Sequence, residues 1–114
     1  MRADWRPLLW RAAFVVTVLA ILVLALAPMP PSPKAWRYTD KVQHAFAFFT
    51  LWVLGARTGW WRALTLVGSL LALGALIELF QGMTGYREAS VADWVADALG
   101  IGLGWALVSV KPAT

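Results

Sequence analysis

The chain contains no cysteine and few charged residues. The absence of cysteine excludes a disulfide framework, thiol catalysis and a thiolate metal site. Charged residues make up 14% of the 114 positions and hydrophobic residues 61%, whereas soluble domains carry roughly 25% charged residues. A soluble domain of this size buries only part of its surface, so it cannot hide this much apolar material. The composition therefore predicts an integral membrane protein.

The basic residues lie at the ends of apolar runs. The net charge is +4, but the arginines and lysines form no continuous basic stripe, so no nucleic-acid partner is expected. They instead bracket the apolar runs, where side chains meet lipid headgroups. Tryptophans gather at the same boundaries, at positions 5, 10, 36, 60 and 61. The lipid bilayer is therefore the first expected partner.

Four mainly apolar runs predict membrane spans, each of which needs roughly 20 mainly apolar residues. The proline-rich stretch 28–33, the basic turn 57–62 and the Gly-containing loop 82–89 separate them. Helices are predicted over about 8–27, 41–56, 63–81 and 91–110. The short connections predict an all-α fold, an antiparallel four-helix transmembrane bundle that forms a single domain over residues 1–114.

The first run has an alternative interpretation. Ala25-Leu26-Ala27 matches the small-residue pattern of a signal-peptide cleavage site. The run is long for a signal peptide, and Pro28 directly after the site is a poor cleavage context. These features favour a retained membrane helix.

The loop charges predict the orientation. With four spans, six basic residues share the side of the two termini and four share the other side. Because basic loops tend to stay in the cytoplasm, both termini are predicted to be cytoplasmic.

Acidic residues converge at the membrane face opposite the termini, where the second helix begins, the third ends and the fourth begins. Every acidic residue except Asp4 lies there, together with the single histidine. Ionisable groups inside a membrane cost at least ~2.5 kcal/mol at mid-bilayer, so they should face the bundle interior and pair. The converging residues are Asp40, Lys41, His44, Glu78, Gln81, Arg87, Glu88, Asp93 and Asp97.

Structural roles compete with functional ones at these positions. Ser90-x-x-Asp93 matches a capping box, and Asp40 with Gln43 resembles one. His44 can be a polar residue packed between helices, whereas capping explains neither Glu78 nor Asp97. The spacing of Gly100 and Gly104 is typical of close helix packing.

Several of these motifs, taken in order, resemble the VanZ-like family of small bacterial membrane proteins. The resemblance covers roughly residues 40–104, and Asp97 stands where the family commonly has asparagine. It implies a multi-pass protein of the bacterial cytoplasmic membrane, in a family whose founding member is associated with teicoplanin resistance. The motifs are Asp40-Lys41-x-x-His44, Glu78-x-x-Gln81, then Arg87, Ser90 and Asp93, then Gly100 with Gly104.

A polar site at the outer face suits a lipid-linked phosphate or cell-wall precursor. Lys41 and Arg87 can bind phosphate oxygens, while His44 can act as acid or base with Asp40 orienting it. The predicted catalytic residues are His44, Asp40, Glu78 and Asp93, and the predicted ligand-binding residues are Lys41, Gln81, Arg87 and Asp97.

Two alternatives stay open. One is a non-catalytic membrane factor that uses the same cluster to bind an envelope partner, a lipid or an antibiotic. The other is a divalent-metal site built from His44, Glu78, Asp93 and Asp97. No cofactor is assigned, and the sequence decides neither between catalysis and binding nor between a monomer and a homo-oligomer.

Overall fold

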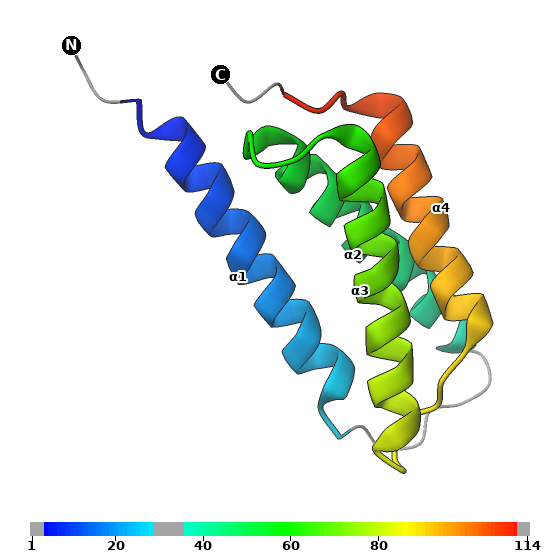
Figure 1. Cartoon of the computed structure of the whole chain (residues 1–114). Helices are drawn as coiled ribbons and strands as arrows, with labels where there is room; N and C mark the ends of the chain where they lie inside the picture. The colour runs from blue at the N-terminus through cyan, green and yellow to red at the C-terminus, as the bar shows by residue number, and fades with distance from the viewer. Residues whose placement is uncertain (1–3, 29–35, 112–114) are drawn as a thin grey trace.

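Four α-helices form the fold in the computed structural model, which describes residues 4–28 and 36–111 apart from the side chains of 36–38. The helices are α1 (Arg6–Leu26), α2 (Trp36–Arg57), α3 (Ala63–Met83) and α4 (Val91–Leu107), and these described ranges contain no strand (Figure 1). The prediction of an all-α fold with four helices is confirmed.

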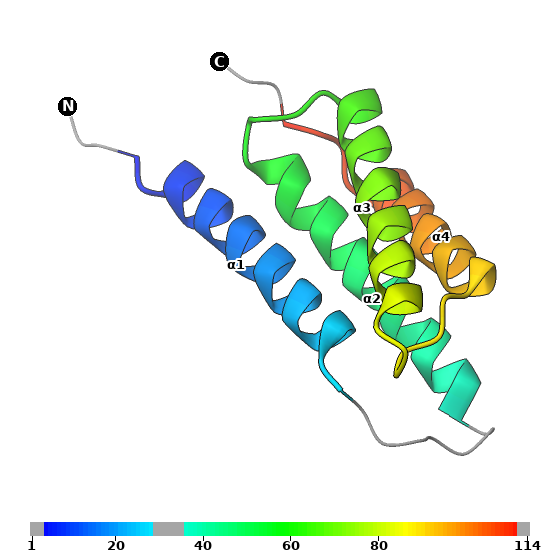
Figure 2. The ribbon, with the colours of Figure 1, turned by 60° about the horizontal axis from the view of Figure 1, so that its bottom comes forward.

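Successive helices run in opposite directions. The start of α1 and the end of α4 lie at one end of the molecule, and the α3–α4 loop and the start of α2 lie at the other (Figure 1). The most extensive packing joins α2 to α4, whereas α1 packs against α2 and α3. Figure 2 shows α1 to one side of the other three helices. The helix ends that carry most acidic residues therefore share one end of the fold.

Two glycines let α4 pack closely against α2. A Cβ atom added at Gly100 would collide with the backbone carbonyl of Ala45, and one added at Gly104 would lie 2.8 Å from the Trp52 indole. A hydrogen atom is therefore the only side chain that fits at Gly100 without moving the α2 backbone. This contact confirms the interpretation of the Gly100–Gly104 spacing as close helix packing.

The apolar core lies between the helices and draws on all four of them. The largest fully buried side chains of this core are Trp52, Phe48 and Leu51, all on α2. Since Phe48 follows His44 by one helical turn, the core directly adjoins the polar residues. The other buried apolar residues of this core are Phe14, Ala56, Leu66, Leu70, Ile77 and Ile101.

Two predicted helix boundaries were wrong. The second helix begins at Trp36 rather than near residue 41, so Asp40 lies inside α2 and cannot be its N-cap. The fourth helix ends at Leu107 rather than near 110, because the chain becomes extended at Val108. The Val108 carbonyl accepts a hydrogen bond of 2.8 Å from Trp52 Nε1, and the Lys111 N–H donates to the Ala56 carbonyl at 2.7 Å. Contacts with α2 thus hold residues 108–111 outside the helix.

The remaining boundaries lie close to the prediction. The first and third helices were expected over about 8–27 and 63–81, and they span Arg6–Leu26 and Ala63–Met83. The end of α1 just before Pro28 agrees with the helix-terminating role of proline. The other prolines of that stretch, at positions 30, 31 and 33, lie outside the described residues.

Helices α1 and α3 are long and apolar enough to cross a membrane. Phe14 is the only buried residue of α1, and much of the remaining apolar surface of that helix is exposed. Helix α4 has 17 residues, and the first turns of α2 carry Asp40, Lys41 and His44. These properties distinguish the two apolar helices from the two that carry most of the polar site.

Candidate functional site

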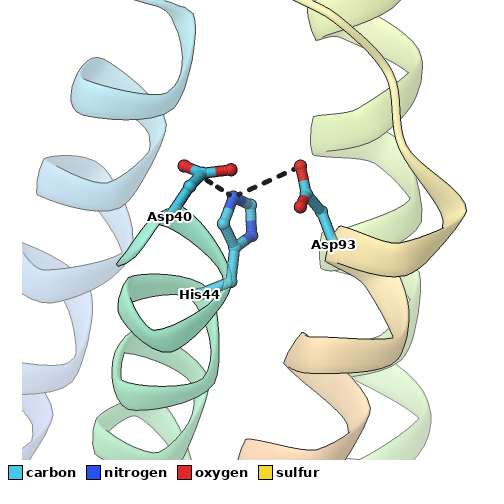
Figure 3. Close-up of side chains that lie close together, drawn as sticks. All are labelled: Asp40, His44 and Asp93. Atoms are coloured by element: carbon cyan, nitrogen blue, oxygen red, sulfur yellow. Dashed lines mark ion pairs between the residues drawn. The ribbon is translucent and has the colours of Figure 1, made fainter. Parts of the chain in front are cut away.

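His44 lies at the centre of the polar cluster. Its Nδ1 atom is 2.9 Å from Asp97 Oδ1 on α4. Its Nε2 atom lies 3.8 Å from Asp40 Oδ1 and 3.8 Å from Asp93 Oδ2, and Figure 3 shows the imidazole between these two carboxylates. The helical spacing in α2 brings Asp40 to His44, and α2–α4 packing brings Asp93 and Asp97. Three carboxylates thus surround one imidazole.

Glu78 and Asp97 form the buried part of the cluster. Asp97 is fully buried and Glu78 is 8% exposed. His44, Glu78 and Asp97 each offer a ligand atom, and these three atoms lie within 4.8 Å of one another. Among the described residues, Asp97 Oδ2 and Glu78 Oε1 have no hydrogen-bond partner. The protein thus places two unpartnered carboxylate oxygens beside an imidazole inside the bundle.

The α4 N-terminus is capped from two directions. The Ser90 hydroxyl accepts a hydrogen bond from the Asp93 N–H at 3.3 Å, which confirms the predicted cap. The Ser90 N–H donates to Glu78 Oε2 at 2.8 Å. Glu78 therefore occupies the position that the acidic residue of a capping box would fill. The prediction that capping does not explain Glu78 was wrong, because a residue of α3 caps α4.

The carboxylate of Asp93 contacts Lys41 at the edge of the cluster. Lys41 Nζ lies 3.4 Å from Asp93 Oδ1, and the Lys41 side chain is 36% exposed whereas that of Asp93 is 8% exposed. Asp93 therefore connects the α4 terminus, Lys41 and His44. The lysine ammonium lies at the exposed edge of the cluster, where a ligand from outside can reach it.

Gln81 and Arg87 contact the end of α1. The Gln81 amide donates to the Ala25 carbonyl at 2.9 Å, and the Arg87 guanidinium donates to the Leu24 carbonyl at 3.5 Å. The last carbonyls of a helix have no partner within it, so these side chains join the α3 end of the fold to α1. The structure places neither of them against the His44 imidazole.

Tyr86 was missed by the sequence analysis. Its hydroxyl donates to the Leu26 carbonyl at 2.7 Å, beside the two contacts just described. No local pattern indicates this contact, because Tyr86 lies in a loop and its partner lies 60 residues away in the sequence. Glu88, which the sequence placed on the same side, is exposed.

The cluster has a clear excess of negative groups. Among the side chains that the structure describes, four carboxylates, those of Asp40, Glu78, Asp93 and Asp97, face one lysine and one histidine. Buried charges need partners of opposite sign, and within this described set Lys41 alone does not supply enough. The arrangement is therefore suited to exchange protons or to bind a cation, and an anion can approach only where Lys41 or a bound cation offsets the carboxylates.

The opposite end of the fold carries different features. A hollow there is lined by three tryptophans, two polar residues and three small or apolar ones, namely Trp60, Trp61, Trp105, Arg62, Ser109, Gly59, Ala63 and Val110. Asp4 lies near that end, where its carboxylate accepts a hydrogen bond of 3.0 Å from the Arg6 N–H. This backbone hydrogen bond, aided by the Arg6 side chain, lowers the pKa of the exposed Asp4 carboxyl. The hollow contains no member of the His44 cluster.

No protein-family model matches the chain, and neither the curated proteins nor the solved structures contain a significant match. The VanZ-like resemblance therefore stays a prediction that depends on the motifs alone.

Proposed function

We propose that the protein is a VanZ-like multi-pass protein whose four helices cross the bacterial cytoplasmic membrane with both termini in the cytoplasm. The exposed apolar side chains of α1 support this proposal, since Leu9, Val16 and Val23 are 63–68% exposed. A bilayer provides the apolar surroundings that these residues lack within the bundle. On α3, Leu64 and Leu79 are 77% and 57% exposed, so this helix also carries apolar side chains that lack apolar surroundings within the bundle.

The two more polar helices have lengths that suit this arrangement. With a rise of about 1.5 Å per residue, the 22 residues of α2 extend beyond the hydrocarbon core of roughly 30 Å. The 17 residues of α4 are shorter, and the extended residues 108–110 add to their reach. The charged first turns of α2 would then lie at the headgroups rather than in the hydrocarbon.

The polar cluster would face the extracytoplasmic side. It lies at the end of the fold opposite the start of α1 and the end of α4 (Figure 1). With the termini in the cytoplasm, His44 and Lys41 lie near the outer leaflet, where lipid-linked precursors of the cell wall are exposed to extracytoplasmic enzymes.

The site binds or acts on a lipid-linked phosphate or cell-wall precursor. The observation that carries this proposal is the contact of His44 with Asp97 at 2.9 Å, next to the partly exposed Lys41. A carboxylate bonded to one ring nitrogen fixes the imidazole tautomer and supports acid–base chemistry at the other. The nearest carboxylate is that of Asp97 rather than Asp40, so Asp97 takes the orienting role and Lys41 binds the phosphate.

A non-catalytic role in binding an envelope partner, a lipid or an antibiotic is the second candidate. The contacts of Gln81 and Arg87 with α1 carbonyls favour it, because these two residues serve the fold and the remaining cluster needs only to recognise a ligand. A link to teicoplanin resistance is compatible with both candidates. His44→Gln separates them, since it keeps a polar side chain and removes the titration.

The test measures binding of a polyprenyl phosphate to protein in nanodiscs, together with teicoplanin sensitivity of cells that produce each variant. Lys41→Gln is expected to weaken phosphate binding about 10- to 100-fold, since a charge-assisted hydrogen bond contributes about 1.5–3 kcal/mol. Lys111→Gln, at the opposite end, is the matched control.

A catalytic His44 predicts that His44→Gln lowers turnover about 10²- to 10⁴-fold while binding is kept. A recognition role predicts only a modest loss of binding, because one neutral hydrogen bond contributes about 0.5–1.5 kcal/mol. If Lys41→Gln and His44→Gln, inserted at normal levels, changed neither phosphate binding nor sensitivity, the proposed function would be wrong.

A further inference from the structure

In the buried half of the cluster, two carboxylate oxygens have no hydrogen-bond partner among the described residues. Asp97 is fully buried, Glu78 is 92% buried, and each keeps one carboxylate oxygen without a partner among the described residues. The two residues come from different helices and meet the His44 imidazole of a third. A buried carboxylate oxygen without a hydrogen-bond partner is costly, and a cation placed between Glu78 and Asp97 would satisfy both of these oxygens.

We propose that His44, Glu78 and Asp97 bind one divalent transition-metal ion of the Zn²⁺ or Mn²⁺ class. One imidazole and two carboxylates form a donor set that such ions accept. Bonds from nitrogen and carboxylate oxygen to Zn²⁺ are about 2.0–2.2 Å long, so two ligands of one tetrahedral ion lie about 3.3–3.6 Å apart. The three donor atoms lie within 4.8 Å of one another, so side-chain rotations that bring the widest pair closer by up to about 1.5 Å would complete the site.

The surroundings hold the ligands in orientation. Ser90 N–H fixes Glu78 Oε2 at 2.8 Å, which leaves Oε1 free for an ion. With Nδ1 of His44 directed to the ion, Nε2–H faces Asp40 and Asp93, each 3.8 Å away. A metal-binding histidine commonly donates its second ring N–H to a carboxylate. Asp40 and Asp93 lie beyond hydrogen-bond distance of Nε2 here, so a small approach of either one would provide that bond.

Gly74 makes room for the Asp97 carboxylate. A Cβ atom at this position would lie 2.7 Å from Asp97 Oδ2, so the oxygen without a partner lies against the α3 backbone one turn before Glu78. The absence of a side chain at Gly74 therefore allows Asp97 to reach the same side of α3 as Glu78.

A second arrangement would place the ion at Nε2 of His44 with Asp40 and Asp93. The structure favours the buried set for two reasons. Asp93 already pairs with the Lys41 ammonium at 3.4 Å, which would repel a cation, and the Asp40 side chain is 49% exposed and can be solvated by water. The proposed ion does not depend on the lipid ligand. It would replace the hydrogen bond between His44 Nδ1 and Asp97 and leave the ring proton on Nε2, so the ion-bound form differs from the acid–base arrangement of the proposed function. It would also offset the carboxylate charge that opposes binding of a phosphate.

The experiment measures Zn²⁺ and Mn²⁺ bound to full-length protein in nanodiscs after chelator treatment, by equilibrium dialysis and metal analysis, with no added lipid phosphate. We expect about one ion per chain. Glu78→Gln keeps an acceptor for the Ser90 N–H and removes the charge, so it should fold and lose the ion. His44→Gln should also lose it, whereas Glu88→Gln, an exposed control with the same change in charge, should bind normally.

Three results would overturn the proposal. The first is a folded wild-type protein that binds neither ion, and the second is undiminished binding by both His44→Gln and Glu78→Gln. The third is a larger loss in Asp40→Asn than in Glu78→Gln, which would move the ion to the other ring nitrogen. Circular dichroism of each variant verifies that the helices are retained.

Failure of this proposal can be told from failure of the proposed function. Binding of polyprenyl phosphate is measured with chelator and with Zn²⁺. If the protein binds the ion but no polyprenyl phosphate, the lipid function is contradicted and the metal site is supported. Phosphate binding that persists in chelator, in a protein that binds no ion, contradicts the metal site alone.

Discussion

Glu78 on α3 accepts a hydrogen bond of 2.8 Å from the backbone N–H of Ser90, the N-cap residue of α4. This contact joins the two helices across their loop and fixes one oxygen of a carboxylate whose other oxygen has no hydrogen-bond partner. The same side chain thus has a structural role at one oxygen and remains available for chemistry at the other. Substitutions of Glu78 must keep an acceptor if they are to test function rather than folding.

Ser90→Ala is expected to destabilise the protein. It removes the hydroxyl that accepts from the Asp93 N–H, and loss of an N-cap side chain costs about 0.5–2 kcal/mol. The free energy of unfolding, measured by denaturant titration in detergent micelles, tests this. Ser109→Ala, at an exposed position beyond α4, is the control. Equal stabilities of the two variants would show that the cap contributes nothing.

Gly100→Ala is expected to disrupt the contact between α4 and α2. The new methyl group would collide with the Ala45 carbonyl, and overpacking of this kind typically costs about 1–3 kcal/mol. Gly102→Ala is the matched control, since no atom lies within 4 Å of a Cβ there, and a helical Gly-to-Ala change at an open site is neutral or stabilising by up to about 1 kcal/mol. Thermal unfolding of both variants tests the prediction. A Gly100→Ala protein as stable as Gly102→Ala would contradict the close packing.

Local patterns predicted the parts of the fold that depend on neighbours in the sequence. The Ser90 cap and the close approach at Gly100 follow from residue types within one or two turns, so the spacing alone indicated them. The early start of α2 was missed because the polar residues before position 41 reduce the apolar signal without breaking the helix. The end of α4 was missed because the Trp52 contact that holds Val108 extended joins residues 56 positions apart.

The sequence was enough to predict which residues belong to the site, but not which of them contact one another. The alternation of four helices was enough to expect His44, Glu78 and Asp97 at one end of the fold. The contacts among these residues could not be predicted in the same way. The spacing within α2 suggested Asp40 as the partner of His44, whereas the contact of 2.9 Å is made by Asp97, 53 positions away. Gln81 also matched a site motif, and its hydrogen bond to the α1 carbonyl of Ala25 depends on packing that no local pattern encodes.

The proposed orientation predicts which loops are accessible from outside the cell. Because the chain has no cysteine, single cysteines can be introduced without a background signal. Glu88→Cys, in the α3–α4 loop, is expected to react with a membrane-impermeant maleimide in intact cells. Arg62→Cys, directly before α3, should react only after the membrane is permeabilised. The reverse pattern would place the termini outside, and labelling of both positions in intact cells would contradict the four-span arrangement.

Trp52→Phe is expected to release the extended segment that follows α4. The fully buried Trp52 indole donates to the Val108 carbonyl, and phenylalanine keeps an aromatic ring but removes this donor. A fully buried acceptor left without its partner costs about 1–3 kcal/mol, so the half-buried Val108 carbonyl should cost less, and the smaller ring adds a cavity. The Lys111 N–H, bonded to the Ala56 carbonyl at 2.7 Å, should then exchange with deuterium faster than in the wild type. Trp105→Phe is the matched control, because the Trp105 ring packs at a tilt against Trp52 from a 43% exposed position. This substitution should change stability by less than about 0.5 kcal/mol. If both variants left the exchange rate of Lys111 unchanged, the Trp52 hydrogen bond would not be what holds residues 108–111 against α2.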